Sequence, residues 1–262
     1  MKVAIVTGGS SGIGQAVCKC LKEKGLKVYE LSRREVALEG ITHICCDVTD
    51  EEAVNKAVDT VLENENKIDI LVNVAGMGIS GAIEFTDLKD AKRQIDVNFF
   101  GMVNMNHKVL PYMRKQGGGR IVNISSVAAP IPIPFQAFYS SSKAAINAYT
   151  CALANEVSPY GISVTAICPG DIASGFTDAR KKVIEGDKEY GGRISRSVNV
   201  MEKDERGGMA PSVAAAYIAK IALKEKVKPL YAIGFTYKLF CVIMKILPIG
   251  LSNKMIGMIY AK

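Results

Sequence analysis

The stretch that decides the fold is Val3-Ala4-Ile5-Val6-Thr7-Gly8-Gly9-Ser10-Ser11-Gly12-Ile13-Gly14, close to the start of the chain. Its first half, residues 3–7, is apolar and β-branched, which predicts a buried strand. A glycine-rich turn follows and leads into a segment with helical periodicity over residues 15–24. Glycines in such a turn let phosphates approach the backbone at the N-terminus of a helix. The stretch therefore predicts a nucleotide site, and an ordinary tight turn is the alternative.

The same alternation of strand and helix continues along the chain. Short apolar runs predict strands at residues 3–7, 27–31, 43–48, 68–73, 120–125, 163–168 and 230–233, and periodic segments predict helices at 15–24, 51–63, 91–115, 139–157 and 212–224. Near-continuous apolar strands separated by helices are typical of an α/β fold with a parallel sheet covered on both faces. We expect a doubly wound sheet of about seven strands. No linker interrupts the pattern, so residues 1–262 are predicted to form a single domain.

Two segments depart from this alternation. Residues 171–210 are rich in charge and glycine and lack clear periodicity, over a length far beyond that of ordinary connections. We interpret them as a lid loop over the substrate, with a disordered connection as the alternative. Residues 235–262 form a basic, apolar C-terminal extension.

The net charge of +7 is concentrated in the C-terminal part of the chain. Residues 224–262 contain seven lysines and one glutamate, a net charge of +6, so the remainder carries only +1. A nucleic-acid binder is expected to show its basic residues as a stripe or patch on its binding face. The near-neutral body therefore indicates that nucleic acid is not a partner.

The seven cysteines are an odd number and lie in apolar segments, and the chain opens without a charged-then-apolar leader. This pattern predicts reduced thiols and a cytoplasmic location. His43, Cys45, Cys46 and Asp47 stand close together, but Cys46 points to the opposite face of a strand from its neighbours. We therefore expect a buried strand there and no metal site.

The glycine turn has the spacing TGxxxGxG, and this resembles the short-chain dehydrogenase/reductase family. The resemblance extends over nearly the whole chain. Asp47-Val48 ends the third predicted strand, Asn73-Val74-Ala75-Gly76 is similar to the family's NNAG with Val in place of its second Asn, and Pro169-Gly170 matches the family's PG motif. The resemblance implies a Rossmann-type fold and an oxidoreductase that uses NAD(H) or NADP(H).

The resemblance assigns one set of residues to the cofactor. They are Thr7, Gly8, Ser10, Ser11, Gly12, Ile13, Gly14, Ser32, Arg33, Arg34, Asp47, Val48, Asn73, Ala75, Gly76, Tyr139, Lys143, Pro169, Gly170, Ile172 and Ser174. An NAD-binding chain would carry an acidic residue about twenty positions after the glycines. Here Ser32-Arg33-Arg34 stands in that place, and a guanidinium binds a 2′-phosphate well. We predict a preference for NADP(H), with NAD(H) as the alternative and a solvated arginine pair as the other interpretation.

Tyr139 and Lys143 are four residues apart, which puts them on one face of a helix. A free phenol has a pKa of about 10, and a nearby ammonium lowers the pKa by favouring the phenolate. The family's motif also places a serine thirteen residues before the tyrosine, which is Ser126, and an asparagine in the long central helix, which is Asn98. The resemblance implies that Tyr139 exchanges a proton with the substrate oxygen, Ser126 hydrogen-bonds it, Lys143 lowers the pKa of Tyr139 and holds the cofactor ribose, and Asn98 supports a relay water.

The substrate is predicted to be apolar or amphipathic. An apolar, proline-rich run at residues 128–135 follows Ser126, and 28 residues extend past Gly234, as in family members that act on steroids, retinoids and other lipids. The preferred interpretation is a hydroxysteroid dehydrogenase acting on sterols or bile acids. A 3-oxoacyl (ACP or CoA) reductase is the runner-up. A non-catalytic NADP sensor is a further alternative, although relatives of that kind typically lose the tyrosine or the lysine.

The C-terminal extension has too many interruptions for a membrane span, since lysines and Pro248 break its apolar runs. Three interpretations remain open: a helical pair that covers the substrate cleft, a subunit contact, or an amphipathic helix on an anionic membrane surface. The last would place a cytoplasmic protein peripherally on a membrane. The resemblance also implies a homodimer or homotetramer, formed through the helices at 91–115 and 139–157.

Overall fold

The computed structural model describes residues 1–261 and contains a seven-stranded sheet in which every pair of neighbours is parallel. The strands are β1 (Val3–Thr7), β2 (Lys27–Ser32), β3 (Thr42–Cys45), β4 (Ile70–Asn73), β6 (Gly119–Ile124), β7 (Ile162–Cys168) and β9 (Leu230–Ala232). Their order across the sheet is β3-β2-β1-β4-β6-β7-β9. The predicted α/β fold of Rossmann type is therefore confirmed. Strands β3 and β4 are shorter than the apolar runs that predicted them.

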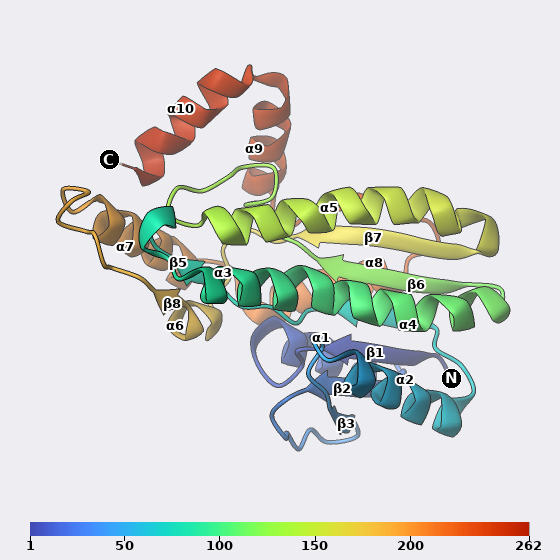
Figure 1. Cartoon of the computed structure of the whole chain (residues 1–262). Coiled ribbons are helices and arrows are strands. Elements are labelled where there is room, and N and C mark those ends of the chain that lie inside the picture. The colour runs from blue at the N-terminus through green and yellow to red at the C-terminus, as the bar shows by residue number, and fades with distance from the viewer. Residues whose placement is uncertain (262) are drawn as a thin grey trace.

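Helices cover both faces of this sheet, because its strands are apolar on both sides (Figure 1). One face carries α2 (Glu51–Glu65), α4 (Gly101–Lys115) and α5 (Ala137–Val157), and the other carries α1 (Gly12–Glu23) and α8 (Pro211–Ala222). Alternate residues of β1 show the division. Ile5 packs with the first group of helices, and Val6 packs with the second. Single turns η1 (Ile83–Phe85) and η3 (Ser158–Tyr160) complete the connections.

The helix predicted at 91–115 starts earlier and is interrupted. It begins as α3 (Leu88–Ile95), where the Asp87 side chain accepts a hydrogen bond from the N–H of Lys89. It then passes through a π-helical segment, η2 (Asp96–Phe100), and continues as α4. π-Helical segments are rare in proteins, and those that occur often lie at functional sites. The predicted site residue Asn98 lies within it.

Residues 171–210, expected to lack regular structure, contain helices and a strand, so that part of the expectation is wrong, and the role as a lid stays a prediction. The segment holds the short helix α6 (Phe176–Ala179), the strand β8 (Lys181–Lys182), which pairs with β5 (Ile79–Ser80), and the helix α7 (Arg193–Arg206). Helix α7 buries Ile194, Val198 and Met201, which are spaced at one face of a helix. The many charges on its other faces conceal this pattern in the sequence.

The C-terminal extension forms a helical hairpin, α9 (Phe235–Ile246) and α10 (Ile249–Tyr260), at the end of the molecule where the strands β6 and β7 finish (Figure 1). Tyr260 packs beside Ile194 and Met201 of α7, and the Nε of Arg193 donates a hydrogen bond of 2.7 Å to the carbonyl of Ala261. The hairpin is thus joined to the segment at 171–210. Within residues 1–261, no helix is long and apolar enough to cross a membrane.

Candidate active site

The predicted site residues lie where the parallel strands end. Thr7, Asn73 and Asn123 are lateral partners on β1, β4 and β6, so the turns that follow these strands leave the sheet side by side. Crevices outside the carboxyl ends of parallel strands are the usual ligand sites of open α/β sheets. The geometry therefore places the glycine turn and the loop at Asn73–Gly76 next to each other.

The glycine turn is held against that neighbouring loop. The Oγ1 of Thr7 accepts hydrogen bonds from the N–H groups of Val74 and Ala75, at 3.1 and 3.2 Å. Gly8 has φ +69°, and a Cβ there would lie 2.7 Å from the Cα of Ala75. A side chain at Gly8 would therefore push the two loops apart.

Beyond this contact, the turn leaves room at the start of α1. A Cβ at Gly14 would meet the carbonyl oxygen of Gly8 at 2.2 Å, so the helix begins close under the turn. A Cβ at Gly12, by contrast, would have only Ser174 nearby, at 3.7 Å, and the Ser11 side chain makes no capping bond. The helix N-terminus thus keeps backbone N–H groups for an anion, with Ile13 beside them. This arrangement fits the pyrophosphate of a dinucleotide.

The end of β2 carries positive charge beside the turn. Arg34 donates from Nη2 to the hydroxyls of Ser10 and Ser11, both at 3.4 Å, and the Oγ of Ser32 donates to the carbonyl of Arg34. The side chain of Arg33 is exposed. Glu30, the nearest acid before the arginines, is buried and lies 2.5 Å from the Nδ1 of His43. The Nη1 of Arg33 lies 3.8 Å from the Oδ2 of Asp47, so this exposed guanidinium is only loosely paired.

His43 has this carboxylate as its partner, and the residues described by the structure contain no cluster of three metal-binding side chains. Asp47 accepts hydrogen bonds from Thr49 and from the Nη2 of Arg93, the latter at 3.0 Å. Burial acts to raise the pKa of Asp47, but these hydrogen bonds hold it below its ordinary value. The neighbouring Val48 packs against Gly101 at the start of α4. Asp47 is therefore a fixed carboxylate at the end of the third strand.

Two further predicted motifs flank the site. Asn73 donates from Nδ2 to Asn106 and Asn123, at 2.8 and 2.9 Å, so its side chain is part of a buried amide network. Gly170 lies directly under the ring of Tyr237, because a Cβ there would lie 2.3 Å from two of the ring carbons. The hydroxyl of Tyr237 in turn donates to Asp171. Helix α9 thus rests on the segment that begins at Pro169 and continues through Ile172.

Tyr139 and Ser126 meet at the centre of the site. The Ser126 side chain lies close enough to Tyr139 to lower the pKa of the phenol, and it accepts a hydrogen bond of 3.1 Å from the N–H of Ala128. Burial raises the pKa of Tyr139 to about 12 and outweighs the lowering by Ser126 and by the charge of Arg180. At neutral pH the phenol is therefore protonated, which is the form needed to donate a proton.

Lys143 lies one helical turn beyond Tyr139, with its Nζ 5.7 Å from the centre of the tyrosine ring. The Nζ donates to the carbonyl of Ile124 at 2.9 Å, and the ammonium is almost completely buried. Burial lowers the pKa of Lys143 from 10.5 to about 8. Gly76 lies next to this ammonium, since a Cβ there would be 3.9 Å from Nζ. The lysine is still charged at neutral pH but is easily neutralised.

Asn98 joins the π-helical segment to the helix that carries the tyrosine. Its Nδ2 donates to the carbonyl of Met77 at 3.0 Å and to the hydroxyl of Ser142 at 3.1 Å, and its Oδ1 accepts from the N–H of Met77 at 2.8 Å. The side-chain amide is thus bonded at both ends and fixes α5 relative to the loop after β4. A Cβ at Gly76 would lie 3.3 Å from the Oδ1 of Asn98 and 3.9 Å from the Nζ of Lys143, so Gly76 lies beside both side chains.

Three residues at the site were missed in the sequence. Phe176 lies against Tyr139 with ring centres 5.9 Å apart, the guanidinium of Arg180 lies 5.7 Å from the centre of the Phe176 ring, and Tyr237 covers Gly170. All three belong to the two segments that were predicted only as a lid and an extension. Their roles depend on packing between distant segments, which leaves no periodic signal. A lone aromatic or arginine in a charged segment does not reveal such packing.

Comparisons with known proteins agree with this geometry. Residues 2–185 match the family model described as short chain dehydrogenase. The chain is 40% identical over 243 residues to a 3-ketodihydrosphingosine reductase of Bacteroides thetaiotaomicron, with 89% of this chain and 90% of that protein covered. It is 31% identical over 255 residues to a probable short-chain type dehydrogenase/reductase, VdlC, of Helicobacter pylori, with 94% and 93% covered. The crystal structure of a short-chain dehydrogenase from Streptomyces avermitilis superposes with TM-score 0.83 at 30% identity and covers 92% and 90% of the two chains.

The buried ammonium predicts a pH-dependent stability. Between pH 8 and pH 10.5, Lys143 binds a proton in the unfolded chain but not in the folded protein, so its contribution to the free energy of unfolding rises with pH. Below pH 8 both states are protonated and this contribution is constant. We expect the free energy of unfolding of wild type, relative to Lys143→Met, to increase by about 2 to 3 kcal/mol from pH 7 to pH 10.

Urea unfolding of the protein without cofactor, at pH 7, 8, 9 and 10, measures this difference. Subtracting the two proteins cancels the titration of groups that they share. Lys115→Met, which removes an exposed lysine at the end of α4, is the matched control. A difference between wild type and Lys143→Met that stays constant over this range would contradict the burial of a charged lysine.

Proposed function

Because this chain belongs to the short-chain dehydrogenase/reductase family, we propose that it is an NADP(H)-dependent oxidoreductase that interconverts a secondary alcohol and a ketone on an amphipathic, lipid-like substrate. The observation that carries the proposal is the placement of Ser126 next to Tyr139, with the ammonium of Lys143 beside the ring, at the sheet edge that also holds the glycine turn. A positioned acid, an orienting donor and a cofactor site together indicate hydride transfer to a carbonyl.

Ser126, Tyr139 and Lys143 carry out the chemistry at the substrate oxygen. NADP(H), when bound, supplies or accepts the hydride. Tyr139 is protonated at neutral pH and can donate its proton to the carbonyl oxygen in the reductive direction. Ser126 is within hydrogen-bonding reach of the same phenol and would donate to that oxygen as it gains negative charge. The nearby Lys143 stabilises the phenolate that remains, and Asn98 holds the helix that carries both residues.

The preference for NADP(H) over NAD(H) is supported by the end of β2. Arg34 already contacts Ser10 and Ser11 of the turn, Arg33 is exposed beside it, and the acid of Glu30 is occupied by His43. A 2′-phosphate placed beyond the ribose would meet two guanidinium groups, one of which, that of Arg33, is loosely paired with Asp47 at 3.8 Å. The family uses a nicotinamide cofactor, so the proposal concerns only which of the two is preferred.

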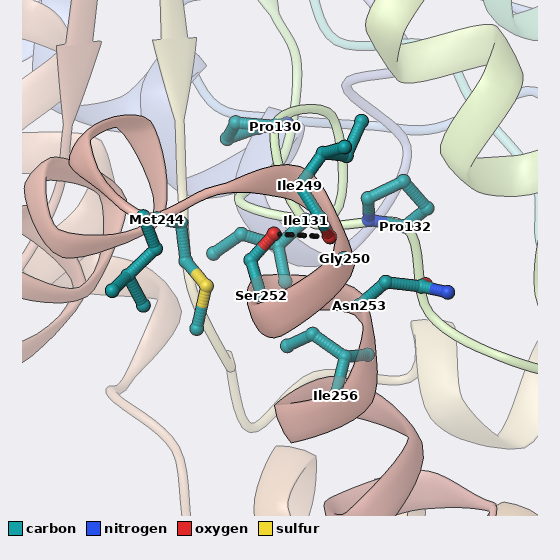
Figure 2. A pocket seen from close by; sticks show the side chains of 10 residues that line it. Pro130, Ile131, Pro132, Met244, Ile249, Gly250, Ser252, Asn253 and Ile256 are labelled. Carbon is teal, nitrogen blue, oxygen red and sulfur yellow. Dashed lines mark hydrogen bonds between the residues drawn. The ribbon is translucent and has the colours of Figure 1, made fainter.

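The lipid-like substrate is supported by the relatives and by the apolar surroundings of the site. The relative from Bacteroides thetaiotaomicron is named for 3-ketodihydrosphingosine, a long-chain ketone with a small polar head. Residues 130–132, in the segment after Ser126, and the hairpin of α9 and α10 line an open pocket of about 580 Å³ (Figure 2). Its walls include Met244 and Ile256 from the hairpin, and its size is within the range of small-molecule sites. We therefore propose a 3-keto long-chain lipid as the substrate class.

The hydroxysteroid substrate predicted from the sequence stays a prediction, because the relatives and the geometry do not test it. The substrate of a 3-oxoacyl reductase, the runner-up interpretation, resembles the proposed substrate in carrying a ketone at the third carbon of a long chain. The sensor alternative has little support, since both Tyr139 and Lys143 are in place. The homodimer or homotetramer also stays a prediction.

Peripheral membrane contact fits the outer surface of the hairpin. Its exposed apolar residues are Phe235, Leu239, Val242, Ile243 and Ile246 of α9 and Ile249, Leu251, Met258 and Ile259 of α10. Those of α9 follow one face of the helix, and residues 226–262 contain lysines but no acidic residue. Apolar side chains flanked by lysines favour an anionic lipid surface. We propose that this face of the hairpin rests on such a surface.

The function is tested by turnover of 3-ketodihydrosphingosine, followed by the loss of NADPH absorbance. Tyr139→Phe keeps the ring that packs on Phe176 but removes the proton donor, so we expect turnover to fall at least 1000-fold while the Kd for NADPH stays within threefold. Tyr149→Phe, on the same helix but away from the site, is the control. Activity of Tyr139→Phe within tenfold of wild type would contradict the mechanism.

The cofactor preference is tested by Arg33→Asp. Replacing a guanidinium by a carboxylate next to a 2′-phosphate removes an attraction and adds a repulsion, so the Kd for NADPH should rise about 10- to 100-fold while that for NADH should not rise. Arg114→Asp, an exposed position at the far end of α4, makes the same charge change elsewhere. Fluorescence titration measures both constants, and equal effects on NADPH and NADH would argue against a phosphate site.

Membrane contact is tested by flotation of the protein with vesicles of phosphatidylcholine, with and without phosphatidylserine. Ile246 is 77% exposed on the hairpin, and Ile246→Glu places a negative charge on the apolar face. We expect it to reduce binding to the anionic vesicles at least tenfold. Val213→Glu, at an apolar residue of α8 that is 57% exposed, should leave binding unchanged. If wild type itself fails to float with anionic vesicles, the hairpin is not a membrane contact.

A further inference from the structure

Arg180 is a buried arginine whose hydrogen bonds are incomplete. It follows the last residue of α6, and its side chain is only 1% exposed. The Nη2 donates to Glu205 on α7, whereas Nε and Nη1 have no hydrogen-bond partner among residues 1–261. Burying a charged donor without an acceptor is costly, so an unpartnered pair of donors in one side chain calls for an explanation.

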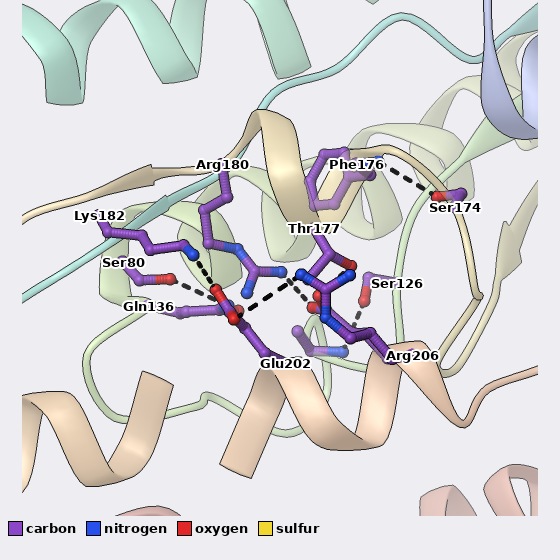
Figure 3. A network of polar contacts seen from close by, with 12 residues as sticks. Ser80, Ser126, Gln136, Ser174, Phe176, Thr177, Arg180, Lys182, Glu202 and Arg206 are labelled. Atoms are coloured by element: carbon purple, nitrogen blue, oxygen red, sulfur yellow. Dashed lines mark hydrogen bonds and ion pairs between the residues drawn. The ribbon is translucent and has the colours of Figure 1, made fainter. Parts of the chain in front are cut away.

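The neighbouring acids do not supply the missing acceptors. The second oxygen of Glu205 accepts from the hydroxyl of Thr177 at 2.7 Å, so that carboxylate is engaged on both sides. Glu202 pairs with Lys182, and Asp171 accepts the hydroxyl of Tyr237. Figure 3 shows Arg180 in this network between α6 and α7. Each acid nearby is thus committed to another group, and the two free donors of Arg180 are left for a ligand.

The position of the guanidinium relates it to the catalytic tyrosine. Both contact the ring of Phe176: the Cζ of Arg180 lies 5.7 Å from its centre, and the centre of the Tyr139 ring lies 5.9 Å from it. The Nε also lies against Gly78 in the loop after β4, 3.4 Å from where a Cβ would stand. The charge is therefore held next to the reacting position but not in contact with the phenol.

We propose that Arg180 is the head-group residue of the substrate site, and that its free Nε and Nη1 donate hydrogen bonds to an oxygen substituent, a hydroxyl or a carboxylate, close to the reacting ketone. The inference rests on the proposed function and names the part of the substrate that this site recognises. A polar head held at Arg180 directs the ketone to Tyr139 and Ser126 and leaves the alkyl chain to the apolar walls. An acceptor there also satisfies donors that the protein alone leaves buried and unpaired.

Three ketones of equal chain length test the proposal: 3-octadecanone, 1-hydroxy-3-octadecanone and 4-oxooctadecanoate. The first has no head group, the second carries a hydroxyl and the third a carboxylate. We expect Arg180→Met to lower kcat/KM about 10- to 100-fold for whichever oxygen-bearing ketone the site prefers, chiefly through KM. The kcat/KM for that ketone should fall at least tenfold more than the kcat/KM for 3-octadecanone.

Controls separate recognition from folding. Arg206→Met removes an exposed arginine of α7 that pairs with Asp178, and should change none of the three reactions. Arg180→Met leaves Glu205 without its partner, so the double variant Arg180→Met/Glu205→Met removes both charges and should show the same substrate pattern at higher stability. Thermal unfolding and NADPH binding report whether each variant is folded.

The outcomes are distinct. A loss confined to the hydroxy ketone or to the oxo acid supports the proposal and identifies the head group. Equal losses for all three ketones would show that Arg180 only holds α6 against α7, and no loss for any of them would show that it faces no substrate. If wild type reduces none of the three and does not reduce 3-ketodihydrosphingosine, the proposed function fails and the head-group role fails with it.

Discussion

The parallel ladder that places Thr7, Asn73 and Asn123 side by side is the constraint on which the rest of the site depends. Parallel strands must all finish at the same edge, so turns from distant parts of the chain are brought together there. The hydroxyl of Thr7 then ties its own turn to the backbone of the next one. Because the approach at Gly8 leaves no room for a side chain, the two turns have one relative position, and the cofactor residues are fixed by it.

Three ionisable side chains are held in this edge at a cost in stability. Burial favours the neutral forms of Tyr139 and Lys143, and Arg180 keeps its charge with part of its donors unpaired. Such groups are expected where cofactor or substrate completes the missing interactions. The tyrosine, protonated at neutral pH, is ready to act as an acid, and the lysine needs only a small change in its surroundings to change its charge. These buried groups are therefore expected to gain their missing interactions when cofactor and substrate bind.

The segments at residues 171–210 and 235–261 surround the same edge. Helices α6 and α7 carry Phe176 and Arg180 to the tyrosine, and the hairpin of α9 and α10 closes over Gly170 through Tyr237. The hairpin is also bound to α7, through Tyr260 and Arg193. Its inner side thus completes the site while its outer side exposes apolar residues and lysines. One element in this way joins the sheet edge to an exposed apolar surface.

The sequence by itself determined the parallel sheet, the glycine turn, and the pairing of Tyr139 with Lys143, because these depend on local periodicity and on fixed spacing within one element. It also indicated positive charge at Arg33 and Arg34. The tertiary structure alone decided that residues 193–206 form a helix, that Glu30 is bound to His43, and that Arg180 and Tyr139 both contact the ring of Phe176. These features come from contacts between residues far apart in the chain, and such contacts have no periodic pattern in the sequence. Burial, and with it the pKa of Tyr139 and Lys143, is likewise a property of the packed protein and not of any segment read alone.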